Sequence, residues 1–272
     1  MNGLPLVSVI IPTKNSAETL GKCLESMENQ TYKNIEIIIV DNYSEDRTRQ
    51  IGEKYNARFY RIRKERSRQV NCGVARACGK YVYRVDSDFV LEPFIVEEAV
   101  SKCENEGYDA LVVHNTSDST IGFWSKVRKL DRDCVKGDNL NVAARFFRKD
   151  VFEKVGGFNE DLVAAEDYDL HNRLVKARFK IGRINAYEVH IGEPKTLAEV
   201  IRKHYYYGKN IERFIKRNSY RGLKQLSPIR LAHIRNWKIF IKNPMLSVGF
   251  AVYQISRYLS VFIGYLTVKA MK

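Results

Sequence analysis

The sequence predicts an α/β protein with a mostly parallel sheet flanked by helices and a C-terminal helical extension. Short runs rich in Val, Ile and Tyr alternate with segments of helical pattern, which is typical of a parallel sheet covered on both faces. Polar residues cluster where these strands should end, as at the ligand-binding edge of an open α/β sheet. The last quarter of the chain is first strongly basic and then apolar.

The expected elements follow one another in regular order. Strands are predicted at Leu6–Ile11, Ile35–Val40, Arg58–Ile62, Tyr81–Val85 and Ala110–Val113, and helices at Ala17–Met27, Glu45–Tyr55, Arg68–Cys78 and Pro93–Glu104. The polar Ile121–Leu140 stretch has a mixed pattern, and Asn141–Phe147 predicts a further strand. Residues 166–178 predict a helix, because Leu170 and Leu174 share one helical face.

Composition limits the class of protein. With 272 residues, 44% hydrophobic and 29% charged, the chain can bury a full core and is not disordered. Five cysteines without metal-ligand spacing indicate free thiols in a reducing compartment. The N-terminus leads straight into a strand, so we expect no signal peptide.

Positive charge is concentrated in one region. Residues 195–242 carry thirteen Lys or Arg side chains and two Glu, a net +11 of the chain's +14. Such a patch suits nucleic acid, anionic lipid or a phosphorylated substrate. No nucleic-acid recognition motif accompanies it, so we expect no nucleic-acid partner. A helix is predicted near Thr196–Arg217 and a loop at Ser219–Ser227.

An apolar tail follows the basic region. Pro244–Val268 is long enough for one membrane span of about 20 residues, but Gln254 and Arg257 interrupt it. A charge at mid-span costs at least ~2.5 kcal/mol. The polar residues share a stripe, so we expect the helix to lie in, or dip into, an anionic membrane surface. The alternative is a helix packed on the protein's own core.

Two aspartates, Asp86 and Asp88, follow the apolar run YVYRV at residues 81–85. Two carboxylates so close together repel each other unless a cation lies beside them. Mg²⁺ or Mn²⁺ is commonly held by one or two carboxylates together with substrate phosphates. Taken alone, such a pair more often marks a solvated turn.

Other motifs accompany the pair. The ordered set SVIIPTKN, IEIIIVDNYSEDRT, RSRQVNCGVARACGKYVYRVDSDF and VGGFNEDLVAAEDYDLHNRL, within residues 5–180, resembles the family-2 inverting glycosyltransferases of the GT-A fold. The resemblance implies a Rossmann-like nucleotide-sugar-binding sheet, Mn²⁺ or Mg²⁺ as cofactor, and a UDP- or GDP-linked sugar as donor.

The resemblance also implies roles for the residues that bind the sugar donor and its metal. It implies Asp88 as the direct metal ligand, with Asp86 contacting the ribose or the metal through water. The residues implied to contact the nucleotide sugar are Pro12, Thr13, Asn15, Asp41, Arg68, Asn71 and Asp86. Asp41 has an alternative role as an N-cap or in an Asx-turn before the helix at Glu45. Arg68, with Arg66 second, replaces a family arginine where this chain has Val70, and His190 is a remote candidate for completing the metal shell.

On the acceptor side, Glu166 and Asp167 follow the Gly156-Gly157-Phe158 loop and match the family's acidic motif. The resemblance implies Asp167 as catalytic base and Glu166 as a positioning group. The alternative is stabilisation of the helix start by acidic residues. Asp169 is expected to be solvated or to cap the helix, and Arg173 is a candidate to pair with Glu166 or Asp169.

These observations predict a hexosyltransferase on the cytoplasmic face of the cell membrane, peripheral or anchored by one helix. The segment HYYYGKNIERFIKR at residues 204–217 resembles lipid-linked members of the family. It implies a polyprenyl-phosphate, lipid-linked or other saccharide acceptor. Two domains are expected, residues 1–195 and residues 196–272. The rivals are a membrane-attached nucleotide-sugar binding protein with a degenerate site and a sugar-phosphate nucleotidyltransferase, although IPTKNSAET lacks the latter's Gly/Arg-rich loop.

Overall fold

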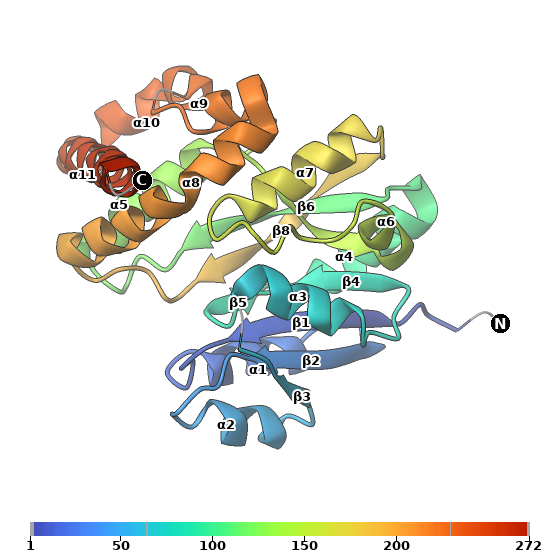
Figure 1. Ribbon diagram of the computed structural model, residues 1–272. Coiled ribbons are helices and arrows are strands. Elements are labelled where there is room, and N and C mark those ends of the chain that lie inside the picture. Colours follow the sequence, from blue (N-terminus) through green and yellow to red (C-terminus); the bar gives the residue numbers. More distant parts are fainter. Residues whose placement is uncertain (1–2, 64, 229, 271–272) are drawn as a thin grey trace. The chain divides into compact units, whose positions relative to one another are not determined.

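A computed structural model describes residues 3–63, 65–228 and 230–270 as strands joined by helices (Figure 1). The strands are β1 Val7–Thr13, β2 Ile35–Asp41, β3 Arg58–Arg61, β4 Tyr81–Arg84, β5 Phe89–Leu91, β6 Ala110–Ser117, β7 Ala144–Arg148 and β8 Ile181–His190. The helices are α1 Leu20–Glu28, α2 Thr48–Lys54, α3 Arg66–Val74, α4 Ile95–Glu106, α5 Phe123–Cys134, α6 Lys149–Lys154, α7 Glu166–Lys176, α8 Leu197–Gln225, α9 Leu231–Arg235, α10 Trp237–Lys242 and α11 Pro244–Ala270.

The chain forms two compact units, each built from separate segments. The first comprises Met1–His114, Ala143–Glu160 and Leu170–Val189, and the second comprises Asn115–Val142, Asp161–Asp169 and His190–Lys272. The expected division into residues 1–195 and 196–272 stays a prediction about domains.

The sheet has the strand order β3-β2-β1-β4-β7-β6-β8-β5. Strands β1, β2, β3 and β4 pair in parallel, with Thr13 opposite Asp41 and Val7 opposite Tyr81. Strand β7 pairs antiparallel with both β4 and β6. The predicted α/β class is therefore confirmed, with parallel strands in the N-terminal half and antiparallel pairing where β7 joins. The parallel half brings the ends of β1, β2 and β4 to one edge.

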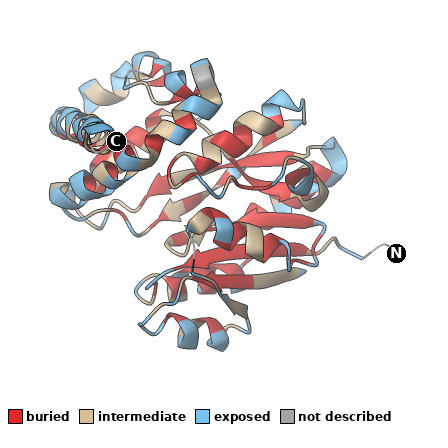
Figure 2. Cartoon of the chain, in the orientation of Figure 1, coloured by how far each residue is buried: buried red, intermediate tan, exposed pale blue. Residues whose placement is uncertain are grey.

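Each face of the sheet has its own apolar core, and Figure 2 shows that the strands are largely buried. Val7, Val9 and Ile11 of β1 pack with α1 and α4, whereas Ile10 packs with α3, α6 and α7. Successive residues of a strand point to opposite faces, so one strand supplies both cores. This alternation fixes the register that positions the strand ends.

The second unit is helical and is built around the pairing of α8 with α11. An added Cβ at Gly208 would lie 2.2 Å from the Val261 carbonyl oxygen, and one at Gly264 would lie 2.3 Å from the Tyr205 carbonyl oxygen. The two glycines therefore let the helix backbones approach closely, as small residues do at tight helix contacts.

The outer side of α11 is apolar and exposed. Its exposed side chains recur every three or four positions, with one adjacent pair: Met245, Val248, Val252, Ile255, Leu259, Phe262, Ile263 and Leu266. We call these eight residues the α11 stripe. The helix is long and apolar enough to cross a membrane by length and composition, but only 22% of its most apolar window is buried inside the protein. The opposite side of α11 packs within the protein, with Tyr253 and Val261 in its apolar clusters, so the alternative of a helix packed on the protein's own core holds for that side.

Three sequence expectations about elements need correction. Residues 219–225, expected as part of a loop, continue α8 to Gln225, because the buried face marked by Ile211 and Phe214 extends to Gln225. The mixed stretch at residues 121–140 contains α5, which buries Val127 and Cys134. Strands β5 and β8 were not expected: β5 has three residues, and the alternating pattern of β8 includes polar side chains.

Candidate active site

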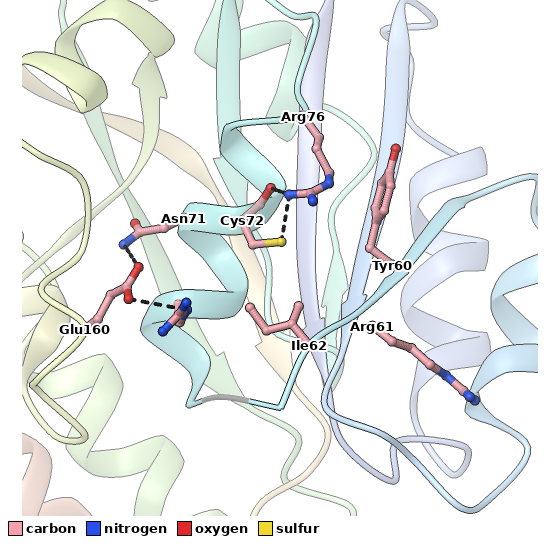
Figure 3. A pocket seen from close by; sticks show the side chains of 8 residues that line it. Tyr60, Arg61, Ile62, Asn71, Cys72, Arg76 and Glu160 are labelled. Carbon is pink, nitrogen blue, oxygen red and sulfur yellow. Dashed lines mark hydrogen bonds and ion pairs between the residues drawn. The ribbon is translucent and has the colours of Figure 1, made fainter.

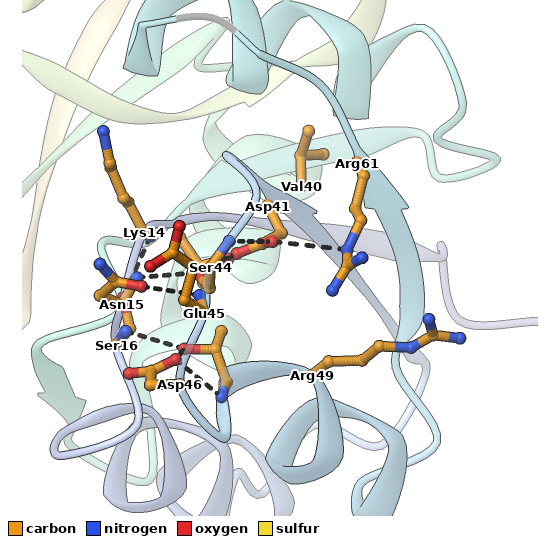
Figure 4. Close-up of polar contacts among 12 residues, drawn as sticks. Lys14, Asn15, Ser16, Val40, Asp41, Ser44, Glu45, Asp46, Arg49 and Arg61 are labelled. Carbon is orange, nitrogen blue, oxygen red and sulfur yellow. Dashed lines mark hydrogen bonds and ion pairs between the residues drawn. The ribbon is translucent and has the colours of Figure 1, made fainter.

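The loop after β1 is tied to the end of β2 by polar contacts around Asp41 (Figure 4). Asp41 is fully buried, and its carboxylate accepts hydrogen bonds from the Thr13 hydroxyl at 2.9 Å and the Ser44 backbone N–H at 2.8 Å. The Asn15 amide oxygen accepts from the Glu45 N–H at 3.0 Å. The bond from the Ser44 N–H spans three residues, whereas an Asx-turn spans two, and the N-cap residue of α2 is Arg47. Contact between Asp41 and a nucleobase stays a prediction.

The backbone of this first loop is shaped for a sharp bend. Pro12 and Thr13 end β1, and Asn15 has a φ of 49°, a left-handed conformation that asparagine tolerates better than most residues. The Asn15 N–H donates to the Ser44 hydroxyl at 2.7 Å. The three residues expected at the nucleoside thus lie together where β1 meets the loop of β2.

Asp86 lies within a group of arginines directly after β4. Arg84 and Arg145 each approach its carboxylate at 3.1 Å, and Arg66 lies at 3.9 Å. Burial alone would raise the pKa of Asp86, but the three guanidinium groups hold that pKa well below its usual range. Asp86 is therefore ionised, and its charge is already matched by protein cations.

Arg145 links Asp86 to a second buried acid, Glu188 of β8. Its Nε lies 3.3 Å from Glu188 Oε2, and the Tyr83 hydroxyl donates to Glu188 Oε1 at 2.5 Å. Burial raises the pKa of Glu188, against the opposing effects of Arg145 and Tyr83. Sequence reasoning missed these two residues. The available signal was a charged side chain within an otherwise apolar strand, because such residues are rarely buried unpaired.

Asp88 lies two residues after Asp86, in the turn that leads from β4 into β5. Both side chains are partly exposed. In that turn, the Phe89 N–H donates to the Asp86 carbonyl at 3.1 Å, and the hydroxyls of Ser87 and Ser16 lie 2.9 Å apart. The edge of the sheet thus presents Asp88 beside an arginine-bound Asp86.

The arrangement of Asp88 fits a divalent ion that takes most of its ligands from substrate and water. No group of three His, Cys, Asp or Glu side chains suited to a metal occurs within residues 3–63, 65–228 and 230–270. Mg²⁺ typically keeps several waters and binds through one or two carboxylates plus phosphate oxygens. The partly exposed Asp88 carboxylate is of the type that such an ion binds.

Arg68 and Asn71 line a pocket of about 460 Å³ on the first unit (Figure 3). Arg68 pairs with Glu160 at 3.6 Å. The Asn71 amide donates to the Phe158 carbonyl at 2.8 Å and accepts from the Phe158 N–H at 2.9 Å. Asn71 therefore holds the glycine loop, and Arg66 is the arginine of α3 that approaches Asp86. Diphosphate contact by Arg68 or Asn71 stays a prediction.

The glycine loop has the backbone role expected of it. Gly156 and Gly157 have φ values of 81° and 61°, which glycine adopts without penalty. An added Cβ at Gly157 would lie 2.7 Å from the Asn71 amide oxygen. Arg173 donates to the carbonyls of Val155 and Gly157. Arg173 therefore fixes this loop, and its expected pairing with Glu166 or Asp169 stays a prediction.

Glu166 and Asp167 belong to the second unit and begin α7. Asp167 is partly exposed, and its carboxylate accepts a hydrogen bond from the Tyr168 N–H at 2.9 Å. Glu166 is buried. Ala165, directly before them, has a φ of 59°, a conformation that costs a non-glycine residue about 1–2 kcal/mol. Backbone strain of this kind is common at functional segments.

Asp169 corrects one expectation. It is 1% exposed and accepts from Arg217 at 3.1 Å and from the Asn218 amide at 3.0 Å. It is therefore neither solvated nor an N-cap but a partner of α8, because α7 packs its first turn within the helical unit. His190 is also buried, and its Nδ1 lies 3.2 Å from Glu193. Metal binding by His190 stays a prediction.

Sequence comparison identifies the class of protein. The profile described as glycosyl transferase family 2 matches residues 8–156, more than half of the chain. An uncharacterized glycosyltransferase of Rickettsia prowazekii is 31% identical over 188 residues, covering 61% of this chain and 57% of that protein. Glycosyltransferase AglE of Haloferax volcanii is 29% identical over 229 residues, covering 76% and 73%.

Solved structures share the fold at lower identity. Mannosyltransferase PcManGT from Pyrobaculum calidifontis, in complex with GDP-Man and Mn²⁺, is 17% identical with a TM-score of 0.61, and the match covers all of this chain and 87% of that one. S. aureus TarS in complex with UDP-GlcNAc is also 17% identical, with a TM-score of 0.56 and coverages of 97% and 90%. The predicted GT-A-like fold is confirmed. The chain belongs to glycosyl transferase family 2 and is a glycosyltransferase.

Proposed function

We propose that this glycosyltransferase is an inverting, divalent-metal-dependent hexosyltransferase that uses a nucleotide sugar and a membrane-bound acceptor. The observation that carries the proposal is the pair of partly exposed aspartates directly after β4. Arg84 and Arg145 hold Asp86, and Asp88 lies two residues later in the following turn. One or two carboxylates together with substrate phosphates are the ligands that Mg²⁺ usually takes in proteins.

On the donor side, Asp88 is the ligand for Mg²⁺ or Mn²⁺. A bound divalent ion would neutralise the diphosphate and improve it as a leaving group. Arg66 is 40% exposed at its side chain and 3.9 Å from Asp86, so it is the α3 arginine placed to contact the diphosphate. Asp86, held by Arg84 and Arg145, fixes that edge of the sheet and the orientation of the turn carrying Asp88.

On the acceptor side, Asp167 is the general base. As the acceptor oxygen bonds to the anomeric carbon, the bond from that carbon to the diphosphate oxygen breaks and the hydroxyl proton passes to Asp167. One displacement inverts the anomeric configuration. The partly exposed carboxylate of Asp167 accepts from its neighbour's backbone N–H and suits this role. A phosphate acceptor is already ionised and depends less on a base.

The donor is a UDP- or GDP-linked sugar. Support comes from PcManGT in complex with GDP-Man and Mn²⁺ and from TarS in complex with UDP-GlcNAc, which share the fold of this chain. Because the fold alone does not choose between the two nucleotides, both belong in the first screen.

The acceptor is a polyprenyl-phosphate or lipid-linked saccharide on the cytoplasmic face of the membrane. The α11 stripe supports membrane contact, and the exposed apolar side chains of α9 and α10 extend it: Leu231, Ile234, Trp237 and Ile241. Basic residues interleave with them, which favours an anionic lipid surface. Five free cysteines suit a reducing compartment.

The proposal is tested by a screen of UDP- and GDP-sugars with Mn²⁺ or Mg²⁺, followed by transfer assays with saccharide and lipid acceptors. Asp167→Asn should reduce transfer to a hydroxyl acceptor by about 10²-fold or more while leaving donor binding unchanged. The matched control is Glu153→Gln on α6, an exposed carboxylate. Donor binding without any transfer would favour the degenerate-site binding protein instead.

A further inference from the structure

Tyr43, two residues after the end of β2, adopts a backbone conformation that is rare for its residue type. Its φ is 50°, in the left-handed region, where the Cβ of a residue other than glycine crowds the following carbonyl oxygen. For a bulky side chain such a φ is an outlier that the surrounding structure has to stabilise. Glycine would adopt it without penalty. The chain therefore carries a tyrosine ring where the backbone alone favours glycine.

The turn that carries Tyr43 is fixed to both neighbouring strands of the sheet. The Asn42 N–H donates to the Thr13 carbonyl at 2.9 Å, at the end of β1. The Ile62 N–H, directly after β3, donates to the Asp41 carbonyl at 2.9 Å. Because these bonds hold the backbone on two sides, the turn cannot relax independently, and the strained φ is part of the folded structure.

A second left-handed residue lies in the facing loop after β1. Asn15 has a φ of 49°, and its N–H donates to the Ser44 hydroxyl at 2.7 Å. Its amide oxygen accepts from the Glu45 N–H at 3.0 Å (Figure 4). Two left-handed turns therefore meet at the carboxyl ends of β1 and β2. Backbone outliers of this kind concentrate at active sites and ligand clamps.

The Tyr43 side chain is exposed and lies beside two arginines. The residue is 46% exposed, and its ring belongs to neither apolar core that the described residues of the sheet form. The guanidinium carbons of Arg63 and Arg61 lie 5.0 Å and 5.9 Å from the ring centroid, within the range of cation–π contact. Arg61 Nε also lies 3.8 Å from Asp41 Oδ2. We call Tyr43, Arg61 and Arg63 the Tyr43 cluster.

The groups of the Tyr43 cluster match the chemistry of a nucleobase. Bases stack on aromatic rings and on guanidinium planes, whichever base is present, because every base has a π-face. Arginine N–H groups also donate to base oxygens, and guanine and uracil both carry a carbonyl oxygen. The cluster lies at the carboxyl ends of the parallel strands, where open α/β sheets bind their ligands. A phosphate group alone would use the arginines but not the ring.

We propose that Tyr43, with Arg61 and Arg63, is the platform on which the nucleobase of the sugar nucleotide stacks. The ring supplies the stacking surface, and the two arginines hold the ring and donate to the base. The fully buried Asp41 supports the turn from below through its bonds to the first loop and to Ser44. This inference rests on the proposed function, which it deepens by assigning further residues to the base of the donor.

The test compares ligand binding by variants of the full chain. GDP-mannose and UDP-GlcNAc are titrated with Mn²⁺ by isothermal calorimetry, and pyrophosphate with Mn²⁺ is the probe that lacks a base. Tyr43→Gly should weaken binding of the nucleotide sugar at least about fivefold, because the stacking surface is lost. It should change pyrophosphate binding less than twofold. Tyr43→Phe, which keeps the ring, should bind both ligands within twofold of the parent chain.

Arg178→Gly is the matched control for the backbone. Arg178 is also exposed and left-handed, with a φ of 60°, and it lies between α7 and β8. Neither glycine variant should lower the midpoint of thermal unfolding, because glycine adopts such a φ freely, and only Tyr43→Gly should weaken donor binding. Arg63→Gln should weaken it about threefold. Arg49→Gln, which removes an exposed cation of α2, should change it less than twofold.

Four results would overturn the platform. They are unchanged donor binding by Tyr43→Gly, an equal loss of pyrophosphate binding in that variant, equal weakening by Arg178→Gly, and equal weakening by Arg49→Gln and Arg63→Gln. Tyr43→Asn is a second variant without the ring, which tolerates the left-handed φ and should show the same loss. If the parent chain binds neither nucleotide sugar, the proposed function fails and the platform with it. Donor binding that persists in every variant refutes this inference alone.

Discussion

Arg145 Nη2 lies 3.1 Å from Asp86 Oδ2, and the same guanidinium pairs with the fully buried Glu188. One arginine thus joins the edge of the donor site to the centre of the sheet. Replacing Arg145 by Met should destabilise the protein by about 3–5 kcal/mol, because a buried acid loses its partner. The free energy of unfolding in urea measures this loss.

The double variant Arg145→Met/Glu188→Gln provides the control for this prediction. It also removes the Glu188 carboxylate that has lost its Arg145 partner, and it should recover a large part of the lost stability. If the double variant is as unstable as the single one, the cost lies in packing of the arginine stem and not in the ion pair.

Much of the donor side could be predicted from sequence. The strand ends that carry Thr13, Asp41 and Asp88 follow from apolar periodicity, since parallel strands bring their carboxyl ends to one edge. The partners of Asp86 could not be predicted in the same way. Arg145 reaches it through antiparallel pairing of β7 with β4, and a strand's pattern does not specify which neighbour it will have.

The helical unit was harder to anticipate for a related reason. Asp131, Glu193 and Arg230 lie far apart in the chain, and each on its own reads as an ordinary surface charge. Only tertiary packing buries them together. The end of α8 was likewise set by burial of Gln225 and not by local propensity.

The glycine contact between α8 and α11 makes a prediction about stability. Gly264→Ala should destabilise the protein, because the new Cβ would lie 2.3 Å from the Tyr205 carbonyl oxygen. Gly21→Ala in α1 is the matched control, with nothing within 4 Å of the added Cβ. It should stabilise the protein by up to about 1 kcal/mol. Thermal denaturation of both variants measures the difference, and equal effects would refute the close approach.

His204 on α8 makes stability depend on pH. Burial lowers its pKa from 6.5 to about 3, with help from Arg257 and against the bond to the Val200 carbonyl. Below pH 6.5 His204 therefore binds a proton in the unfolded chain but not in the folded chain. The free energy of unfolding consequently falls as pH decreases from about 6.5 toward 3. Between pH 6.5 and 5 this amounts to about 2 kcal/mol.

The variant His204→Phe isolates this effect. Urea unfolding at pH 7, 6 and 5 should show a flatter dependence than in the parent chain, because the titrating ring has been replaced by one that cannot ionise. An unchanged slope over this range would show that other groups cause the loss. The carboxylates with lowered pKa contribute only at more acidic pH.

The α11 stripe predicts membrane binding that point substitutions can remove. Ile255 and Phe262 are 67% and 56% exposed, so Ile255→Glu/Phe262→Glu should leave the fold intact. The double variant should lose most of its partitioning onto anionic liposomes in a flotation assay. Val175→Glu on α7, also at an exposed apolar position, should bind as the parent does. Retained binding by the double variant would argue against contact through α11.

The central claim is that Asp88 binds the cation that accompanies the sugar nucleotide. Calorimetric titration of GDP-mannose and UDP-GlcNAc, each with and without Mn²⁺, measures this on the parent chain and on Asp88→Asn. The account predicts binding of at least one donor that is strengthened by Mn²⁺ in the parent and loses that dependence in the variant. Equal, Mn²⁺-strengthened binding by both proteins would contradict it.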